Sequence, residues 1–294
     1  MNKVLFGVVA FLLKLISLLP FWLLYLISDL LFVFLYHILK YRRSVVQTNL
    51  ANAFPGKSSE ERSGIEKRFY SFLADMFVES IKSISITRAE LNERYHFENL
   101  KDITKHLDSG RSVIAVSGHY GNWEWGPLGI PFELNCEILV VYKPLADSKF
   151  DNMINSVRSR FGTIMIPMKQ TLRKMAEYKN EPHVLVLVGD QTPTREESQY
   201  FTNFLNQPTA VFLGVEKIAA KTNNPIIYFS IKRIKRGYYK SVVEPLIDNP
   251  KDCAEHEITD AHTRMLDHLI QKEPDYWLWS HKRWKFKPED IKND

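Results

Sequence analysis

A histidine and a carboxylate five residues apart are the residues of this chain best placed to do chemistry. His119 and Glu124 lie in the segment SGHYGNWEW, residues 117–125. Histidine is the side chain most suited to proton transfer near neutral pH. A carboxylate on its second ring nitrogen would fix the tautomer and stabilise the imidazolium. Because no serine nucleophile stands between them, the pattern predicts a general base that acts on a hydroxyl group of the substrate itself.

The same segment also fits other interpretations. A histidine near a glutamate is commonly structural, so the spacing alone leaves that alternative open. Gly118 and Gly121 would let the backbone approach a ligand, and we assign Asn122 to substrate binding. A metal site needs three or four ligands, and the sequence has no H-x-x-x-H or C-x-x-C pattern. We therefore expect no metal.

Short apolar runs alternate with helical periodicity through most of the chain, which predicts an α/β fold with a largely parallel, buried sheet. The expected strands are 112–117, 137–142, 163–166, 183–188 and 225–231, with 238–243 pairing with the last. The expected helices are 60–86, 150–161, 172–178, 210–222 and 255–272.

Two groups of polar residues directly follow expected strands. Ligands of open α/β sheets gather at the carboxyl ends of the strands. His119 follows the strand at 112–117, and Asp190 and Gln191 follow the strand at 183–188. Asp190 would pair with an arginine, bind substrate or form a turn.

Arginines supply candidate anion-binding groups. The guanidinium fork suits phosphate or carboxylate, and Arg158 and Arg160 stand two residues apart. Such a pair cannot share one face of a helix, so we expect one of them to be structural. Near the C-terminus, HKRWKFK (281–287) interleaves basic and aromatic residues, and its Arg283 and Lys285 are either phosphate ligands or part of a solvated basic end.

The charge of the chain is concentrated at its N-terminus. The 294 residues include 39 Lys and Arg against 34 Asp and Glu, a net charge of +5. Residues 1–57 hold six basic residues and one acidic residue, so the remainder is neutral, which argues against a nucleic-acid binder. With 45% hydrophobic residues and two cysteines, the chain is neither disordered nor a disulfide scaffold.

Residues 4–39 form a nearly unbroken apolar stretch whose only charges are Lys14 and Asp29. About 20 such residues suffice to span a membrane. Pro20 fits a kinked or interfacial helix equally well, and a buried helix pair remains an alternative. The basic residues at 40, 42 and 43 place the C-terminal body of the chain on the cytoplasmic side. We expect a membrane anchor or interfacial helix at 1–43 and a catalytic domain at 44–294.

Several blocks of the sequence resemble a known family. GHYGNWEW resembles the H-x4-D/E motif of the glycerolipid acyltransferase superfamily and, more narrowly, of the lipid A biosynthesis (lauroyl/myristoyl) late acyltransferases. Further blocks occur in that family's order: NLANAFP (49–55), VYKP (141–144), VRSRFG (157–162), GDQ (189–191) and WLWSHKRWK (277–285). The resemblance implies a mostly parallel sheet flanked by helices, with an N-terminal membrane-associated segment. Lys143 departs from the family, many of whose members have arginine there.

The resemblance also implies an activity. An acyl chain would pass from an acyl-carrier-protein thioester, or acyl-CoA, to a hydroxyl of a Kdo-bearing lipid A precursor at the cytoplasmic face of the inner membrane, with no cofactor. His119 would be the general base and Glu124 would orient it. The implied substrate-binding residues are Asn122, Arg158, Arg160, Asp190, Gln191 and Arg283.

The sequence leaves other functions open. The acceptor could be another bacterial lipid, such as a lysophospholipid or an aminolipid, because the motif acts only on the hydroxyl. A non-catalytic lipid-binding membrane protein is a further alternative. The basic cluster at Lys232, Arg233, Lys235 and Arg236, or the one at the C-terminus, would dock the acidic acyl carrier, unless the first is simply a solvated hairpin.

Overall fold

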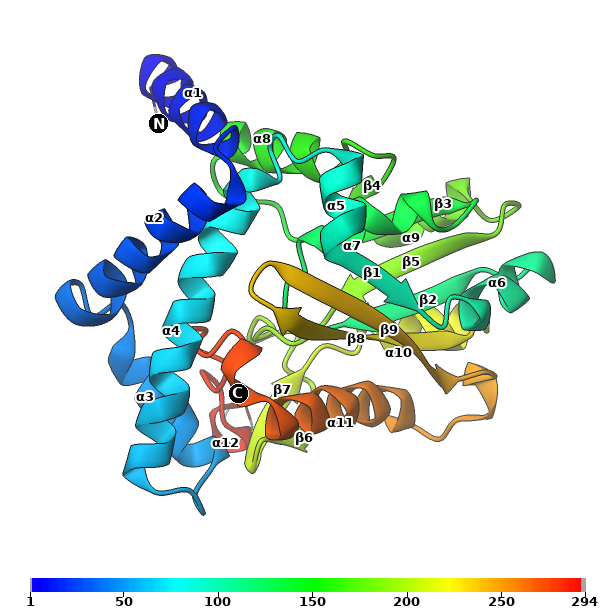
Figure 1. The fold of residues 1–294 in the computed structure, drawn as a ribbon. Coiled ribbons are helices and arrows are strands. Elements are labelled where there is room, and N and C mark those ends of the chain that lie inside the picture. The colour runs from blue at the N-terminus through cyan, green and yellow to red at the C-terminus, as the bar shows by residue number, and fades with distance from the viewer. Residues whose placement is uncertain (1, 292–294) are drawn as a thin grey trace.

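A seven-stranded sheet forms the centre of the molecule in the computed structural model, which describes residues 2–291 (Figure 1). Its strand order is β1-β9-β8-β2-β5-β3-β4. The five strands from β8 to β4 run parallel, whereas β9 returns antiparallel beside β8 and pairs in parallel with β1. The prediction of an α/β fold with a mostly parallel sheet is confirmed. The strands of this sheet are β1 (Tyr95–Glu98), β2 (Val113–Ser117), β3 (Glu137–Tyr142), β4 (Ile164–Pro167), β5 (His183–Val188), β8 (Ile226–Lys235) and β9 (Tyr238–Ile247).

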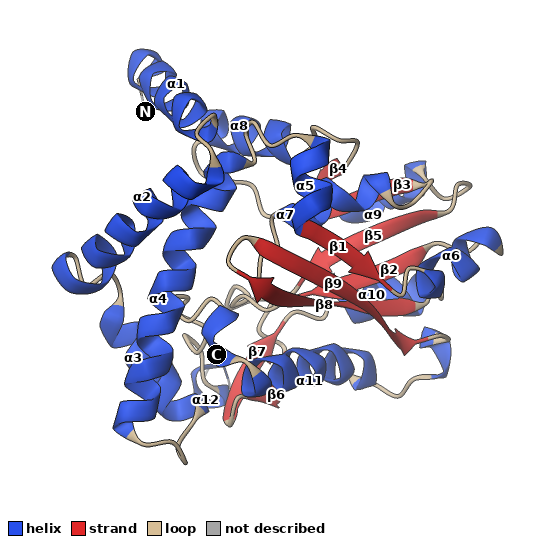
Figure 2. Cartoon of the chain, in the orientation of Figure 1, coloured by secondary structure: helices blue, strands red, loops and turns tan. Residues whose placement is uncertain are grey.

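Helices cover both faces of the sheet, which explains why its central strands are continuously apolar (Figure 2). Ile114 and Val116 of β2 face one core, which α10 and α11 also line, while Val113 and Ala115 face a second core beneath α6. The helices after residue 40 are α3 (Arg43–Ala53), α4 (Ser59–Lys82), α5 (Arg88–Arg94), α6 (Lys101–Asp108), α7 (Trp125–Gly129), α8 (Ser148–Arg158), α9 (Thr171–Glu177), α10 (Gly214–Thr222), α11 (Glu257–Lys272) and α12 (Pro288–Ile291).

The helix predicted at 210–222 is wrong in its first part. Residues Gln207–Val211 form strand β7, which pairs antiparallel with β6 (Tyr200–Phe204), and the helix begins only at Gly214. The turn between the two strands holds Leu205 and Asn206 at φ of +50° and +61°, which closes a hairpin. The apolar residues Ala210 and Val211 are buried as part of this hairpin. The sequence-based interpretation also missed the short strand β1.

The apolar N-terminus forms two helices, α1 (Lys3–Ser17) and α2 (Phe21–Val33). Pro20 separates them, since proline has no N–H to donate and cannot continue the first helix. A five-residue π-helix, Phe34–Ile38, extends α2 directly. The kinked form anticipated from Pro20 is therefore present. Phe21–Ile38 is long and apolar enough to cross a membrane, by length and composition alone.

Helix α4 connects these N-terminal helices to the sheet. It begins with a capping box, in which Ser58 Oγ accepts the N–H of Glu61 and the Glu61 carboxylate accepts the N–H of Ser58. It runs beside α2 in Figure 1. Near its start, Glu66 accepts two hydrogen bonds from Arg43, the first residue of α3. Arg43 is thus bound within the protein.

Candidate active site

His119 lies in the loop that follows β2, and its hydrogen-bonded partner is Asp190. The two ends meet because β2 and β5 are paired parallel neighbours, with Ser117 opposite Val188. Nδ1 of His119 lies 2.5 Å from Oδ1 of Asp190, and the backbone N–H of His119 donates to Oδ2 at 2.9 Å. The indole N–H of Trp277 donates to the same Oδ2 at 2.8 Å. Asp190 is therefore fixed by three donors and holds the histidine ring in one orientation.

This arrangement shifts the pKa of both partners. Burial alone would lower the pKa of His119, but the charge and the hydrogen bond of Asp190 outweigh it and raise that pKa. Burial would raise the pKa of Asp190, whereas His119 and the indole N–H of Trp277 lower it to about 2. Asp190 is thus an ionised acceptor for Nδ1–H, which leaves the lone pair of Nε2 available to take a proton.

Two side chains border the free nitrogen of His119. The amide nitrogen of Gln191 lies 3.2 Å from Nε2, so it occupies the direction from which an acceptor hydroxyl would have to approach. The ring of Trp123 packs edge-on against the imidazole, with 5.2 Å between the ring centroids. Gln191 therefore lies beside His119, and its role in substrate binding stays a prediction.

Glu124 differs from its predicted arrangement. Its two carboxylate oxygens accept from Arg158, at 2.8 Å from Nε and 2.5 Å from Nη2, in a bidentate pair that joins the loop 118–124 to α8. Asp190 has taken the position on Nδ1 that we assigned to Glu124. The charge of Glu124 still raises the pKa of His119, and that of Arg158 lowers it. Glu124 therefore acts on the histidine through its charge, and Arg158 is bound to protein.

Asn122, which we expected to contact substrate, has a fully buried side chain. Its Nδ2 donates to Oε2 of Glu79 at 2.7 Å, and its Oδ1 accepts the N–H of Trp125 at 3.0 Å. Asn122 thus fastens the loop 118–124 to α4. The second arginine of the R-x-R pair, Arg160, donates to the backbone carbonyls of Ser83 and Ile86, beyond the end of α4.

The two glycines of the loop serve packing, contrary to the expected approach to a ligand. A Cβ on Gly118 would lie 2.8 Å from a methyl carbon of Leu266. A Cβ on Gly121 would lie 2.5 Å from Cγ2 of Ile231, and Gly121 also has φ of +59°. A side chain at either position would displace its neighbour, and the positive φ of Gly121 further favours glycine there.

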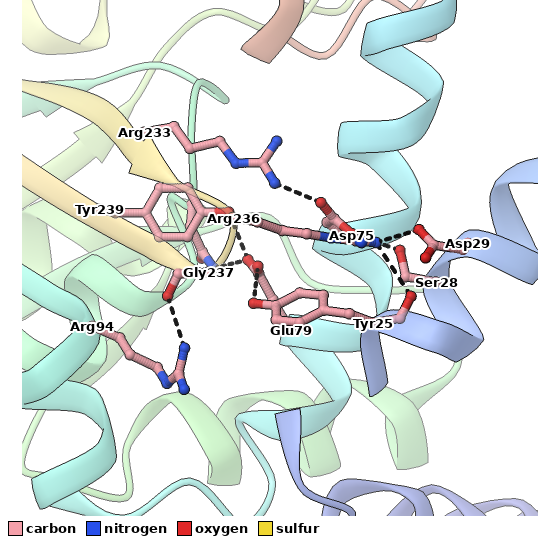
Figure 3. A network of polar contacts seen from close by, with 11 residues as sticks. Tyr25, Ser28, Asp29, Asp75, Glu79, Arg94, Arg233, Arg236, Gly237 and Tyr239 are labelled. Carbon is pink, nitrogen blue, oxygen red and sulfur yellow. Dashed lines mark hydrogen bonds and ion pairs between the residues drawn. The ribbon is translucent and has the colours of Figure 1, made fainter. Parts of the chain in front are cut away.

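Glu79 is a buried carboxylate behind the loop 118–124, and sequence reasoning missed it. It accepts from Tyr25 of α2 at 2.9 Å, from Asn122 at 2.7 Å and from Tyr239 of β9 at 2.8 Å (Figure 3). Burial and the nearby charge of Asp75 raise its pKa to about 7, although the two tyrosine hydroxyls act in the opposite direction. Glu79 joins three elements at one point.

Arg283 also differs from its predicted role in substrate binding. It is 3% exposed and lines a cavity of about 20 Å³ with Asp190, Tyr228 and His262. A cavity of this size has room for about one water molecule, so a lipid phosphate does not fit. Within residues 2–291, Nε and Nη1 of Arg283 have no hydrogen-bond acceptor, and burial lowers its pKa to about 10. Arg283 lies behind Asp190, inside the protein.

Half of the basic cluster beside Gly237 is bound internally. Arg233 and Arg236 both pair with Asp75 of α4, at 2.6 Å and 2.7 Å, and Arg236 also pairs with Asp29 of α2 (Figure 3). This leaves Lys232 and Lys235 from the cluster for an acidic partner. Lys143, which follows β3, is exposed. Among the residues that the structure describes, no three His, Cys, Asp or Glu side chains are grouped to hold a metal ion.

Comparison with known proteins gives a family match over nearly the whole chain. The family model described as bacterial lipid A biosynthesis acyltransferase matches residues 2–286. A lipid A biosynthesis acyltransferase of Haemophilus influenzae is 22% identical over 275 residues, covering 92% of this chain and 84% of the relative. A lipid A biosynthesis palmitoleoyltransferase of Escherichia coli is 22% identical, covering 85% of this chain and 81% of the relative. A lipid A biosynthesis lauroyltransferase of Escherichia coli is also 22% identical, covering 86% of this chain and 82% of the relative.

The raised pKa of Glu79 predicts a pH-dependent stability. An unfolded glutamate ionises near 4.5, so between about pH 4.5 and 7 the folded state holds a proton that the unfolded state has lost. The free energy of unfolding contributed by Glu79 must fall as the pH rises through this window. Denaturant titrations at pH 5 and pH 7.5 should show this fall, on the order of 2 kcal/mol, in the wild type and not in Glu79→Gln. The exposed Glu133→Gln serves as the control. If the free energies of unfolding of the wild type and of Glu79→Gln differ by the same amount at both pH values, the assignment is contradicted.

Proposed function

Since the chain belongs to the bacterial lipid A biosynthesis acyltransferase family, we propose that it transfers a fatty acyl chain from an acyl-carrier-protein thioester to a hydroxyl of a lipid A precursor. Membership makes it an enzyme of lipid A biosynthesis. The donor, the acceptor hydroxyl and the residues that do the chemistry are our proposal. The observation that carries it is the hydrogen bond between His119 Nδ1 and Asp190, which leaves Nε2 free to act as a base.

The proposed reaction begins with the acceptor hydroxyl at Nε2 of His119, in the place of the Gln191 amide. As the hydroxyl oxygen attacks the thioester carbonyl carbon, its proton moves to Nε2. The new C–O bond forms, the tetrahedral intermediate collapses and the C–S bond breaks. The imidazolium returns its proton to the leaving thiolate, so that the products are an ester and a free thiol. Asp190 stays ionised throughout and stabilises the imidazolium.

We place the enzyme at the cytoplasmic face of the inner membrane. The exposed apolar side chains of α1 and α2 support a membrane location, and the proposed acceptor and product are amphipathic lipids that reside in a membrane. Lys40 and Arg42, directly after the apolar stretch, are exposed and can contact anionic headgroups. An acyl carrier protein would reach the site from the same compartment.

The function is tested by mass spectrometry of lipid A from a strain that lacks this protein. We expect the loss of one acyl chain, and the mass difference gives its length. Complementation with the wild-type gene should restore the full mass, and the His119→Ala variant should not. Unchanged lipid A together with altered lysophospholipids or aminolipids would contradict the lipid A acceptor and identify the alternative one.

The roles of His119 and Asp190 are tested by purified variants. His119→Ala should lower kcat/KM by about 10²- to 10⁴-fold, the usual contribution of a general base. Asp190→Asn should also lower the rate. Because it removes the charge that raises the pKa of His119, the rise of activity with pH should move to lower pH. The exposed His268→Ala is the matched control. Near wild-type turnover by His119→Ala would rule out this mechanism.

Glu124 and Arg158 should shift the pH profile in opposite directions. The base is active when neutral, so activity rises with pH as His119 loses its proton. Glu124→Gln removes a charge that raises the pKa of His119 and should move this rise to lower pH. Arg158→Met removes a charge that lowers it and should move the rise to higher pH. If both variants keep the pH profile of the wild type, the ion pair acts only by positioning the loop.

A further inference from the structure

A row of polar contacts, which we call the polar seam, fastens α2 to the body of the protein (Figure 3). From α2, Tyr25 donates to Glu79 at 2.9 Å and Ser28 donates to Asp75 at 2.7 Å. Asp29 accepts from Arg236 at 2.6 Å. These three residues are spaced so that they lie along one side of the helix. One side of α2 therefore contacts α4 and the β8–β9 hairpin.

The opposite side of α2 is apolar and uncovered. The exposed large side chains of α2 and of the π-helix that extends it are 46–70% exposed, and most recur every three to four residues. They are Trp22, Leu26, Leu30, Val33, Phe34 and Ile38. A continuous apolar stripe of this kind on a protein surface marks an interaction site.

The polar seam is incompatible with α2 crossing a bilayer. Were α2 to span, the segment of α4 that carries Asp75 and Glu79 would lie at the same depth, and so would the hairpin with Arg233 and Arg236. Charged side chains are costly in hydrocarbon. In addition, backbone groups at the turn of an open hairpin cannot be satisfied there. The sequence of Phe21–Ile38 is long enough to cross, but its attachments prevent it.

Helix α1 is also attached to the body, near both of its ends. Phe6 packs edge-on against Phe150 of α8 with 5.3 Å between centroids. The carbonyl of Ser17 accepts from Ser85, which follows α4, at 2.5 Å. With 15 residues α1 is about 22 Å long, which is shorter than the roughly 30 Å hydrocarbon core. Its outer side chains, such as Val4 and Phe11, are exposed.

We propose that α1 and α2 lie flat in the headgroup region of an anionic bilayer, with one side on the protein and the other in lipid, and that the chain does not cross the membrane. This inference rests on the membrane location proposed above. The exposed basic residues Lys3, Lys14, Lys40 and Arg42 along this apolar segment favour anionic headgroups. Amphipathic helices bind membrane interfaces in this way. The N-terminus and the catalytic body then share one side of the membrane.

The first experiment locates the N-terminus in the full-length enzyme. Lys3→Cys on α1 and Lys101→Cys on α6 are made separately in a Cys136→Ser, Cys253→Ser background, since both native cysteines are free thiols. A membrane-impermeant maleimide should label both sites in inverted inner-membrane vesicles and neither in intact spheroplasts. Labelling of Lys3→Cys only from the outer side, or only after detergent is added, overturns the proposal. Labelling does not depend on turnover, so its outcome is separate from that of the proposed activity.

The second experiment tests the apolar stripe. Leu30→Glu places a charge on the exposed side of α2, and Leu172→Glu places the same charge on an exposed leucine of α9, away from α1 and α2 (Figure 1). Flotation with vesicles of phosphatidylethanolamine and phosphatidylglycerol should show at least tenfold weaker binding for Leu30→Glu and little change for Leu172→Glu. Equal binding by both variants overturns the role of the stripe. Equal thermal midpoints for the two variants exclude unfolding as the cause.

Discussion

Two carboxylates one helical turn apart on α4, Asp75 and Glu79, join most parts of this structure to one another. Both are about 1% exposed, and a buried carboxylate is tolerated only with partners that satisfy it. Asp75 binds two arginines of the hairpin and a serine of α2. Glu79 binds α2, β9 and the loop 118–124. Removing either carboxylate would leave several buried donors unpaired, so the N-terminal helices, the hairpin and the loop 118–124 depend on each other.

In the candidate active site, Asp190 and Glu124 have different roles. The base proposed above needs a fixed ring to present Nε2 to a hydroxyl group, and Asp190 fixes the ring because its own position is set by three donors. Glu124 is left to hold the loop against α8 through Arg158. Since it also contributes charge near the imidazole, one residue can affect both geometry and basicity.

Much of the framework could be predicted from the sequence because it depends on local patterns. The buried strands β2, β3 and β5 are short apolar runs, and the loops after β2 and β5 carry His119 and Asp190. The pairing of those two residues required knowing that β2 and β5 are adjacent, which apolar runs do not encode. Glu79 lies inside an ordinary amphipathic helix and gains its role only from partners far along the chain. The helix predicted at 210–222 began too early because buried Ala210 and Val211 fit a strand equally well.

The ion pairs of the structure show which charged residues are bound within the protein and which stay exposed. Two of the charged residues in the first 57, Arg43 and Asp29, are bound to the body. The basic residues that stay exposed, such as Lys3, Lys14 and Lys40, accompany apolar side chains. In the hairpin, Arg233 and Arg236 face inward to Asp75. An acidic carrier that docked beside the hairpin would therefore meet Lys232 and Lys235 alone. Binding of such a carrier would need further basic positions, such as the exposed Lys282, because the neutral body offers no long-range attraction.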